Sequence, residues 1–163
     1  MQIRPETEAD HAIIRRLTEA AFAPMPFSEG DEADAVDKLR RDGDLTLSLV
    51  AEDKGAVVGH IAFSPVTAGE GSFDWYGLGP VSVWPERQKG GVGTALITTG
   101  LTALQELSAQ GCVLIGDPVY YFRFGFVGDG RLSYRDLRKE YVQWLAFGDA
   151  KPSGVLKFSP GLE

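Results

Sequence analysis

A glycine-rich segment between a predicted strand and a predicted helix constrains this chain more than any other feature. The segment runs from Gln88 to Thr94 and reads Gln-Lys-Gly-Gly-Val-Gly-Thr. Its missing side chains let backbone amides approach a ligand closely, and the first amides of the following helix have no partners within that helix. The helix dipole also favours negative charge at this end. The segment therefore predicts an anion-binding loop, with an ordinary glycine-rich turn as the alternative.

The spacing of these glycines argues against two widespread phosphate-binding loops. A Walker loop requires Gly-x-x-x-x-Gly-Lys-Ser/Thr, and a dinucleotide-binding loop requires Gly-x-Gly-x-x-Gly. Residues 88–94 match neither pattern and have the form Gln-x-x-Gly-x-Gly instead.

Two amphipathic helices are predicted near the start of the chain. Thr7 and Asp10 have the spacing of a capping box, and apolar residues then recur at helical spacing until Pro24 and Pro26. Apolar residues at 33, 36 and 39 mark the second helix, which a turn at 42–44 closes.

Strands and helices alternate through the rest of the chain. Residues 47–51 and 57–63 predict a hairpin, and residues 75–83 predict a strand with a kink at 77–80, because proline is tolerated in a strand mainly at an edge or a bulge. The further elements expected are a helix from 92 to 107, a strand at 112–115, a short helix at 120–124, and strand candidates at 126–127, 141–147 and 155–158. This order predicts a single α/β domain over residues 1–163, with helices around one mixed sheet.

Composition and charge argue against several classes of protein. Lys and Arg number 16 against 23 Asp and Glu, and the formal charge of -7 disfavours nucleic acid as a partner. Cys112 is the single cysteine, and His11 and His60 have no metal-ligand spacing, so we expect neither disulfides nor a metal site. No apolar stretch has the length of a signal peptide or a membrane span, and we therefore expect a cytoplasmic protein without a membrane partner.

Three segments in the same order resemble the GNAT superfamily of acetyltransferases. The Gln-x-x-Gly-x-Gly segment resembles its acetyl-CoA pyrophosphate motif, and residues 78–87 resemble the strand and turn that precede this motif. Residues 120–126 are similar to its Tyr-x-x-x-Gly-Phe segment. The runs that begin at Gly59 and Gly116 resemble the bacterial YhbS-like branch, so the likeness covers nearly the whole chain.

The resemblance implies a fold, a co-substrate and a set of binding residues. The fold would be a mixed, mostly antiparallel sheet of six to seven strands, splayed between the fourth and fifth and flanked by about four helices. Acetyl-CoA would be the co-substrate, with its pantetheine arm along Val81, Ser82 and Val83. The loop residues implied in cofactor binding are Gln88, Lys89, Gly90, Gly91, Val92, Gly93 and Thr94.

The resemblance also implies two catalytic groups. Acetyl transfer to an amine needs a neutral nucleophile, stabilisation of the oxyanion, and a proton for the leaving thiolate. The backbone amide of Val83 would lie near the thioester oxygen. Tyr121, four residues before Gly125, matches the family position of the general acid, and a tyrosine keeps its proton at neutral pH. The alternative for Tyr121 is a packed aromatic side chain.

The general base is not identified by the sequence. Relatives often carry a carboxylate on the strand before the loop, but residues 77–80 read Gly-Leu-Gly-Pro. Asp74, Glu86 and His60, the last together with Ser64, are the candidates. Water suffices if the amine arrives neutral.

The sequence therefore predicts an N-acetyltransferase that moves an acetyl group from acetyl-CoA to an unidentified primary amine by direct attack in a ternary complex. The acceptor would be a small molecule or a peptide, and the protein would act as a monomer or a homodimer. The apolar loop from Phe22 to Phe27 would cover the acceptor side. The alternatives are an acyl-CoA-binding sensor or interaction module with little turnover, and an acetyltransferase of protein lysines or N-termini.

Overall fold

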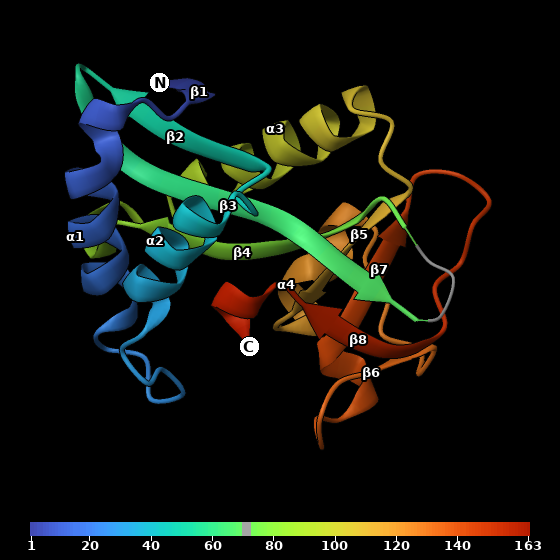
Figure 1. The fold of residues 1–163 in the computed structure, drawn as a ribbon. Helices are drawn as coiled ribbons and strands as arrows, with labels where there is room; N and C mark the ends of the chain where they lie inside the picture. Colours follow the sequence, from blue (N-terminus) through green and yellow to red (C-terminus); the bar gives the residue numbers. More distant parts are fainter. Residues whose placement is uncertain (70–72) are drawn as a thin grey trace.

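One mixed β-sheet runs through the centre of the molecule (Figure 1). The computed structural model describes residues 1–69 and 73–163. Within this part of the chain the strands are Gln2–Pro5 (β1), Leu47–Asp53 (β2), Ala56–Ala68 (β3), Trp75–Val83 (β4), Gly111–Ile115 (β5), Leu132–Ser133 (β6), Val142–Ala146 (β7) and Gly154–Phe158 (β8). The sheet order is β1-β2-β3-β4-β5-β7, and β8 pairs with both β3 and the short β6.

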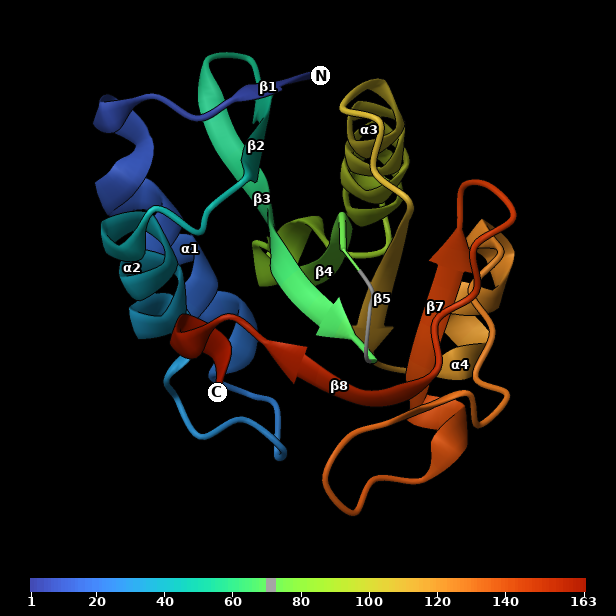
Figure 2. The same ribbon diagram turned by 45° about the vertical axis from the view of Figure 1, so that its right-hand side comes forward.

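Helices cover both faces of this sheet. The α-helices of the described residues are His11–Phe22 (α1), Glu32–Asp42 (α2), Val92–Glu106 (α3) and Pro118–Tyr121 (α4). Figure 2 shows α1 and α2 together on one side of the β2–β3 pair and α3 on the other. Ile14 of α1, Val36 of α2 and Val50 of β2 form one apolar cluster, whereas Leu96 of α3 packs with Phe63 in the larger core.

Local sequence signals set the ends of the first two helices. The Asp10 carboxylate accepts a hydrogen bond of 2.7 Å from the backbone N–H of Thr7, as the predicted capping box requires. A short 3₁₀ turn at Glu8–Asp10 leads into α1. Helix α2 ends at Gly43, which has a φ of 77°, and glycine adopts this left-handed conformation without the Cβ penalty of other residues.

Strand β4 parts from β5 after only a short stretch of pairing. It pairs with β3 along most of its length, but with β5 only over Trp75–Gly77. Two residues of β4, Gly79 and Pro80, lie opposite one residue of β3. This bulge is the kink predicted at 77–80. Beyond it, the edge of β4 that faced β5 has no neighbouring strand among the described residues.

The predicted α/β architecture is confirmed, with a difference in the number of strands. The described residues form eight strands and not six to seven. The sequence analysis missed β1, which has four residues, and β6, which has two. The helix expected at 120–124 is α4 followed by a 3₁₀ turn at Phe122–Phe124, and Val127 forms an isolated bridge with Trp144 in place of a strand.

Neither a membrane span nor a metal-binding cluster occurs in the part of the chain that the structure describes. No helix there combines the length and the apolar character needed to cross a membrane. No group of three or more His, Cys, Asp or Glu side chains within residues 1–69 and 73–163 could hold a metal ion.

Candidate active site

A cleft of about 670 Å³ lies where β4 leads into the glycine-rich loop and α3. Residues from distant parts of the chain border it, including the end of α1, the loop after α1, and α4. Most of the binding residues expected from the sequence meet here, namely Val81, Val83, Gln88, Lys89, Gly91, Gly93 and Thr94. Ser82, Gly90 and Val92 belong to the same segments but do not border the cleft.

The start of α3 is built to receive an anion. Gly91 caps the helix in the left-handed conformation, with a φ of 89°, and its carbonyl accepts the N–H of Ala95. The amides of Val92, Gly93 and Thr94 precede the first such bond, so the helix itself offers them no acceptor. Helix α3 has 15 residues, and its dipole favours negative charge at this end.

Cationic and aromatic side chains border the same end of the cleft. Lys89 and Arg123 are its cationic lining residues within the described chain. The Arg123 Nε donates to the Tyr120 carbonyl at 2.9 Å, and its guanidinium carbon lies 4.5 Å from the centroid of the Tyr120 ring. The Tyr120 hydroxyl lies 3.3 Å from the Thr94 Oγ1. Neither Tyr120 nor Arg123 was assigned to the site from the sequence, because only the fold brings α4 beside α3.

The unpaired edge of β4 presents backbone amides to the cleft. The N–H of Trp84 donates to the carbonyl of Val58 on β3 at 3.2 Å. Backbone groups alternate in direction along a strand, so the N–H groups of Val83 and Val81 point away from β3. The Gln88 side chain donates to the Val83 carbonyl at 3.1 Å. The edge therefore combines free amide donors with the apolar side chains of Val81 and Val83.

Tyr121 packs beside Tyr120 but, unlike Tyr120, does not border the cleft. Its ring contacts the end of β5 at Gly116, where an added Cβ would lie 2.7 Å from the tyrosine Cε2. It also packs edge-on against Phe126, with ring centroids 6.1 Å apart. Burial, and to a smaller extent the nearby Tyr120, raises the pKa of the Tyr121 hydroxyl to about 12. A phenol with this pKa is protonated at neutral pH and can donate a proton.

The expected base candidates lie away from the cleft. Asp74 is exposed in the turn before β4, and Glu86 is exposed in the 3₁₀ turn Pro85–Arg87. His60 and Ser64 are fully buried on β3, and neither borders the cleft. The structure thus brings none of the four to the cleft.

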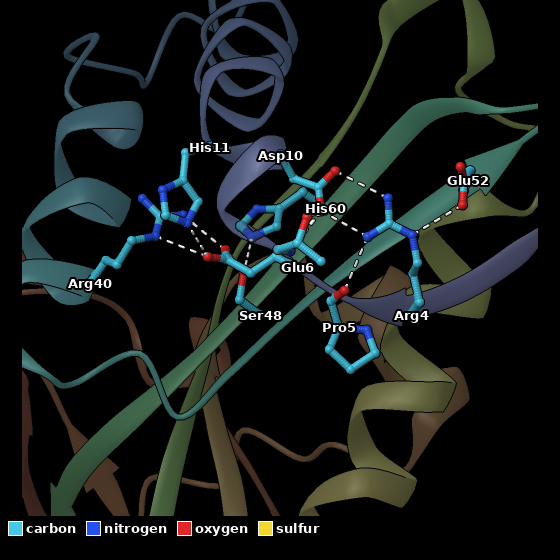
Figure 3. Close-up of polar contacts among 10 residues, drawn as sticks. Arg4, Pro5, Glu6, Asp10, His11, Arg40, Ser48, Glu52 and His60 are labelled. Atoms are coloured by element: carbon cyan, nitrogen blue, oxygen red, sulfur yellow. Dashed lines mark hydrogen bonds and ion pairs between the residues drawn. The ribbon is translucent and has the colours of Figure 1, made fainter.

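His60 belongs instead to a polar network beneath α1 and α2 (Figure 3). The Glu6 carboxylate accepts from Arg40 of α2, from His11 of α1 and from the Ser48 hydroxyl of β2. The Ser48 Oγ lies 2.8 Å from the His60 Nε2. This network joins the segment after β1 to two helices and two strands.

The network fixes the tautomer of His60. A carboxylate only accepts hydrogen bonds, so the Ser48 hydroxyl donates its proton to Glu6 and accepts from the His60 Nε2–H. Burial lowers the pKa of His60 to about 4, against the opposing charge of Glu6 and with a smaller contribution from Arg40. The neutral ring therefore carries its proton on Nε2. Its Nδ1 is a buried acceptor without a partner among the described residues, as are the Ser64 and Ser82 hydroxyls.

The chain matches known proteins over most of its length. A family model described as an acetyltransferase (GNAT) domain matches residues 2–127. The uncharacterized N-acetyltransferase YhbS of Escherichia coli strain K12 is 40% identical over 128 residues, which cover 77% of this chain and 73% of that protein. The uncharacterized N-acetyltransferase YjhQ of the same strain is 38% identical over 124 residues, which cover 73% of this chain and 65% of that protein.

Two solved structures share the whole fold. A GNAT family acetyltransferase from Brucella melitensis, in complex with acetyl-CoA, has a TM-score of 0.89 and 48% identity, and the match covers 99% of this chain and 97% of that one. The YhbS structure from Escherichia coli, in complex with CoA, has a TM-score of 0.88 and 32% identity, with 99% and 91% covered. The family match and these identities show that this chain belongs to the GNAT family of N-acetyltransferases.

Proposed function

We propose that this protein transfers an acetyl group from acetyl-CoA to a primary amine by direct attack within a ternary complex. The observation that carries the proposal is the union, in one cleft, of an anion-binding helix start with the unpaired edge of β4. The acetyl-CoA and CoA held by the solved relatives support acetyl-CoA as the co-substrate.

The cofactor would lie along the loop and the β4 edge. Its pyrophosphate would accept hydrogen bonds from the amides of Val92, Gly93 and Thr94, with the charges of Lys89 and Arg123 nearby. Its pantetheine arm would pair with the free backbone groups of β4, which otherwise lack partners. The proposed set keeps Gln88 and Gly91, which border the cleft, and Ser82 and Gly90, which are next to lining residues in the chain.

Two β4 amides can receive the thioester oxygen. Val83 is the residue expected from the family resemblance, and its N–H points into the cleft. Val81 has the same orientation and lies two residues farther from the loop, about 7 Å at a rise of about 3.3 Å per residue. Because the thioester is at the end of the arm remote from the pyrophosphate, the Val81 amide is the alternative to that of Val83 as oxyanion donor, and one oxygen can bind only one of the two.

The proposed acetyl transfer consists of four bond changes that follow one another in order. The neutral amine attacks the thioester carbon, the new C–N bond forms, and the carbonyl oxygen becomes an oxyanion held by the amide of Val83 or of Val81. The C–S bond breaks, and Tyr121 donates its proton to the leaving thiolate and regains one from water. Tyr121 adjoins the cleft through Tyr120, with the two ring centroids 5.0 Å apart. The proton that the amide nitrogen loses passes to water, since Asp74, Glu86, His60 and Ser64 lie outside the cleft.

Tyr121 gives the sharpest test of this proposal. Replacing Tyr121 by Phe removes the proton donor and retains the ring that packs on Gly116 and Phe126. We expect turnover to fall about 100-fold or more, the usual contribution of a general acid, while calorimetric affinity for acetyl-CoA stays unchanged. Tyr141→Phe, at an exposed position outside the cleft, is the matched control. Equal turnover in the wild type and Tyr121→Phe would remove Tyr121 from the mechanism.

Two alternatives share the cofactor cleft. A sensor of acyl-CoA would bind acetyl-CoA and release no CoA, and a protein acetyltransferase would require a lysine or N-terminal peptide as acceptor. We also propose that residues 1–163 act as one domain in the cytoplasm, as a monomer or a homodimer. The fully buried Cys112, the only cysteine, is consistent with a reducing compartment.

A further inference from the structure

A second pocket, of about 330 Å³, adjoins the cofactor cleft at the kink of β4. Leu78, Gly79 and Pro80 border it, and they directly precede Val81 of the cleft. Phe22, at the end of α1, borders both spaces. A molecule in this pocket would therefore lie next to the part of β4 where the acetyl group is proposed to be held.

The pocket is bordered by one carboxylate that has no ion-pair partner among the described residues. Glu32, in the first turn of α2, accepts hydrogen bonds from the Ser28 hydroxyl at 2.7 Å and 2.8 Å. Among the described residues it has no Lys, Arg or His partner within ion-pair distance. The other charged lining residue is Arg135, whose Nη2 lies 3.9 Å from the Glu163 carboxylate. The unmatched charge of the pocket is therefore that of Glu32.

Aromatic side chains form the walls of the pocket. Tyr134 and Phe158 meet edge to face, with ring centroids 5.1 Å apart. Glu163 fixes them, because its carboxylate accepts from the Tyr134 hydroxyl at 2.8 Å and from the Phe158 backbone N–H at 2.9 Å. Arg135 lies over the outer part of this wall, 5.0 Å from the Tyr134 ring centroid. Phe22 contributes a further aromatic ring. The pocket lining therefore combines aromatic side chains with the carboxylate of Glu32.

We propose that this pocket binds the acceptor and that the acceptor class is a primary amine on a compact aromatic skeleton. The ammonium group would bind Glu32 and would lose one proton to water before the neutral amine attacks. The ring would pack against Phe22, Tyr134 and Phe158. The inference rests on the proposed acetyltransferase function and deepens it. The volume lies at the lower end of the range for small-molecule sites, which favours a single-ring amine over a peptide or a folded protein. The net charge of -7 also favours a cationic acceptor.

Binding can be tested without turnover. We would titrate 2-phenylethylamine into the protein saturated with CoA and measure heat, because CoA fills the cofactor cleft but carries no acetyl group. Two matched ligands divide the interaction into its parts: 2-phenylethanol lacks the ammonium group, and ethylamine lacks the ring. We expect 2-phenylethylamine to bind and both matched ligands to bind at least about tenfold more weakly.

Variants assign this binding to the pocket. Glu32→Gln keeps the size of the side chain and an acceptor for Ser28, and we expect it to weaken 2-phenylethylamine binding by about tenfold or more. Glu29→Gln, at an exposed carboxylate in the loop that precedes α2, should leave binding unchanged. Tyr134→Leu should weaken 2-phenylethylamine binding and leave CoA affinity as in the wild type. Equal affinity in the wild type and Glu32→Gln, or equal binding of 2-phenylethanol, would overturn the inference.

The two proposals fail in different ways. Acetylation of spermidine or of lysine peptides, combined with no binding of 2-phenylethylamine, would overturn the acceptor class and leave the transferase function standing. Glu32-dependent binding of 2-phenylethylamine, combined with no release of CoA from acetyl-CoA, would support the pocket and contradict the transferase function.

Discussion

The buried His60 makes the stability of this protein sensitive to mild acid. Burial lowers its pKa from 6.5 to about 4 in the folded protein. Below pH 6.5 His60 is therefore protonated in the unfolded chain but still neutral in the folded chain. The free energy of unfolding falls as the pH falls towards 4. The full shift corresponds to about 3 kcal/mol, of which about 2 kcal/mol is lost between pH 7 and pH 5.

The variant His60→Gln isolates this contribution. Its amide N–H can replace the Nε2–H that donates to Ser48, but it does not titrate. We expect the wild type to lose about 2 kcal/mol more than the variant between pH 7 and pH 5, measured by urea unfolding followed through tryptophan fluorescence. His11 is present in both proteins and cancels in the comparison.

Other groups affect a lower pH range. Burial raises the pKa of the Glu6 carboxylate, but its hydrogen bonds from Arg40 and Ser48 lower it more. The pKa of Glu6 therefore lies below its ordinary value of 4.5. The stability that Glu6 provides is lost as the pH falls below that value, mostly under the window from 7 to 5. If His60→Gln and the wild type lost the same free energy over this window, the account of a neutral, buried His60 would be wrong. Nitrogen chemical shifts of the ring would check the Nε2–H tautomer independently.

Three further substitutions test the packing and the site. Gly116→Ala places a Cβ 2.7 Å from the Tyr121 Cε2, so the tyrosine ring must shift. We expect steady-state turnover to fall while the calorimetric affinity for acetyl-CoA is retained. Unchanged turnover would contradict the role given to Tyr121. Gly91→Ala puts a side chain at a left-handed position, at a cost of about 1–2 kcal/mol. The free loop of the variant can escape this cost by leaving the conformation that binds acetyl-CoA, so we expect affinity to fall by up to about 5- to 30-fold. Gly43→Ala is its control, because Gly43 is also left-handed but remote from the cleft, and equal affinity losses in both variants would count against the loop. Gly100→Ala brings a Cβ within 2.3 Å of the Phe63 ring, and we expect the free energy of unfolding, measured in urea, to fall by about 1–3 kcal/mol. Thr99→Ala, on the exposed side of α3, should change the free energy of unfolding little.

Features whose causes are local in sequence were predictable. The glycine spacing of 88–94 between a strand and a helix determines the loop at the start of α3, and the Gly-x-Gly-Pro run at 77–80 determines the kink of β4. The capping box at Thr7 and the glycine at 43 likewise act within a few residues of themselves. These are the parts of the site that the sequence analysis identified.

Features that depend on tertiary pairing were not predictable. Strand β1 has no alternating pattern, and it is extended because Gln2 pairs opposite Glu52. Strand β6 consists of two residues held by β8. The same reason explains the second pocket, since Glu32 and Tyr134 lie about a hundred positions apart in the chain and meet only through the fold. The sequence analysis looked for a carboxylate on β4 and had no signal that α2 supplies one nearby.

Release of CoA thiol from acetyl-CoA, measured with and without primary amines, tests the central claim most directly. The panel would contain 2-phenylethylamine, polyamines, amino acids, aminoglycosides and lysine peptides. Cys112 adds little background in the folded protein, because it is fully buried and burial raises the pKa of its thiol. We predict release that depends on both the amine and Tyr121, with one acetylated amine formed per CoA. Folded protein that binds acetyl-CoA but releases no CoA with any amine would contradict the account and favour a sensor.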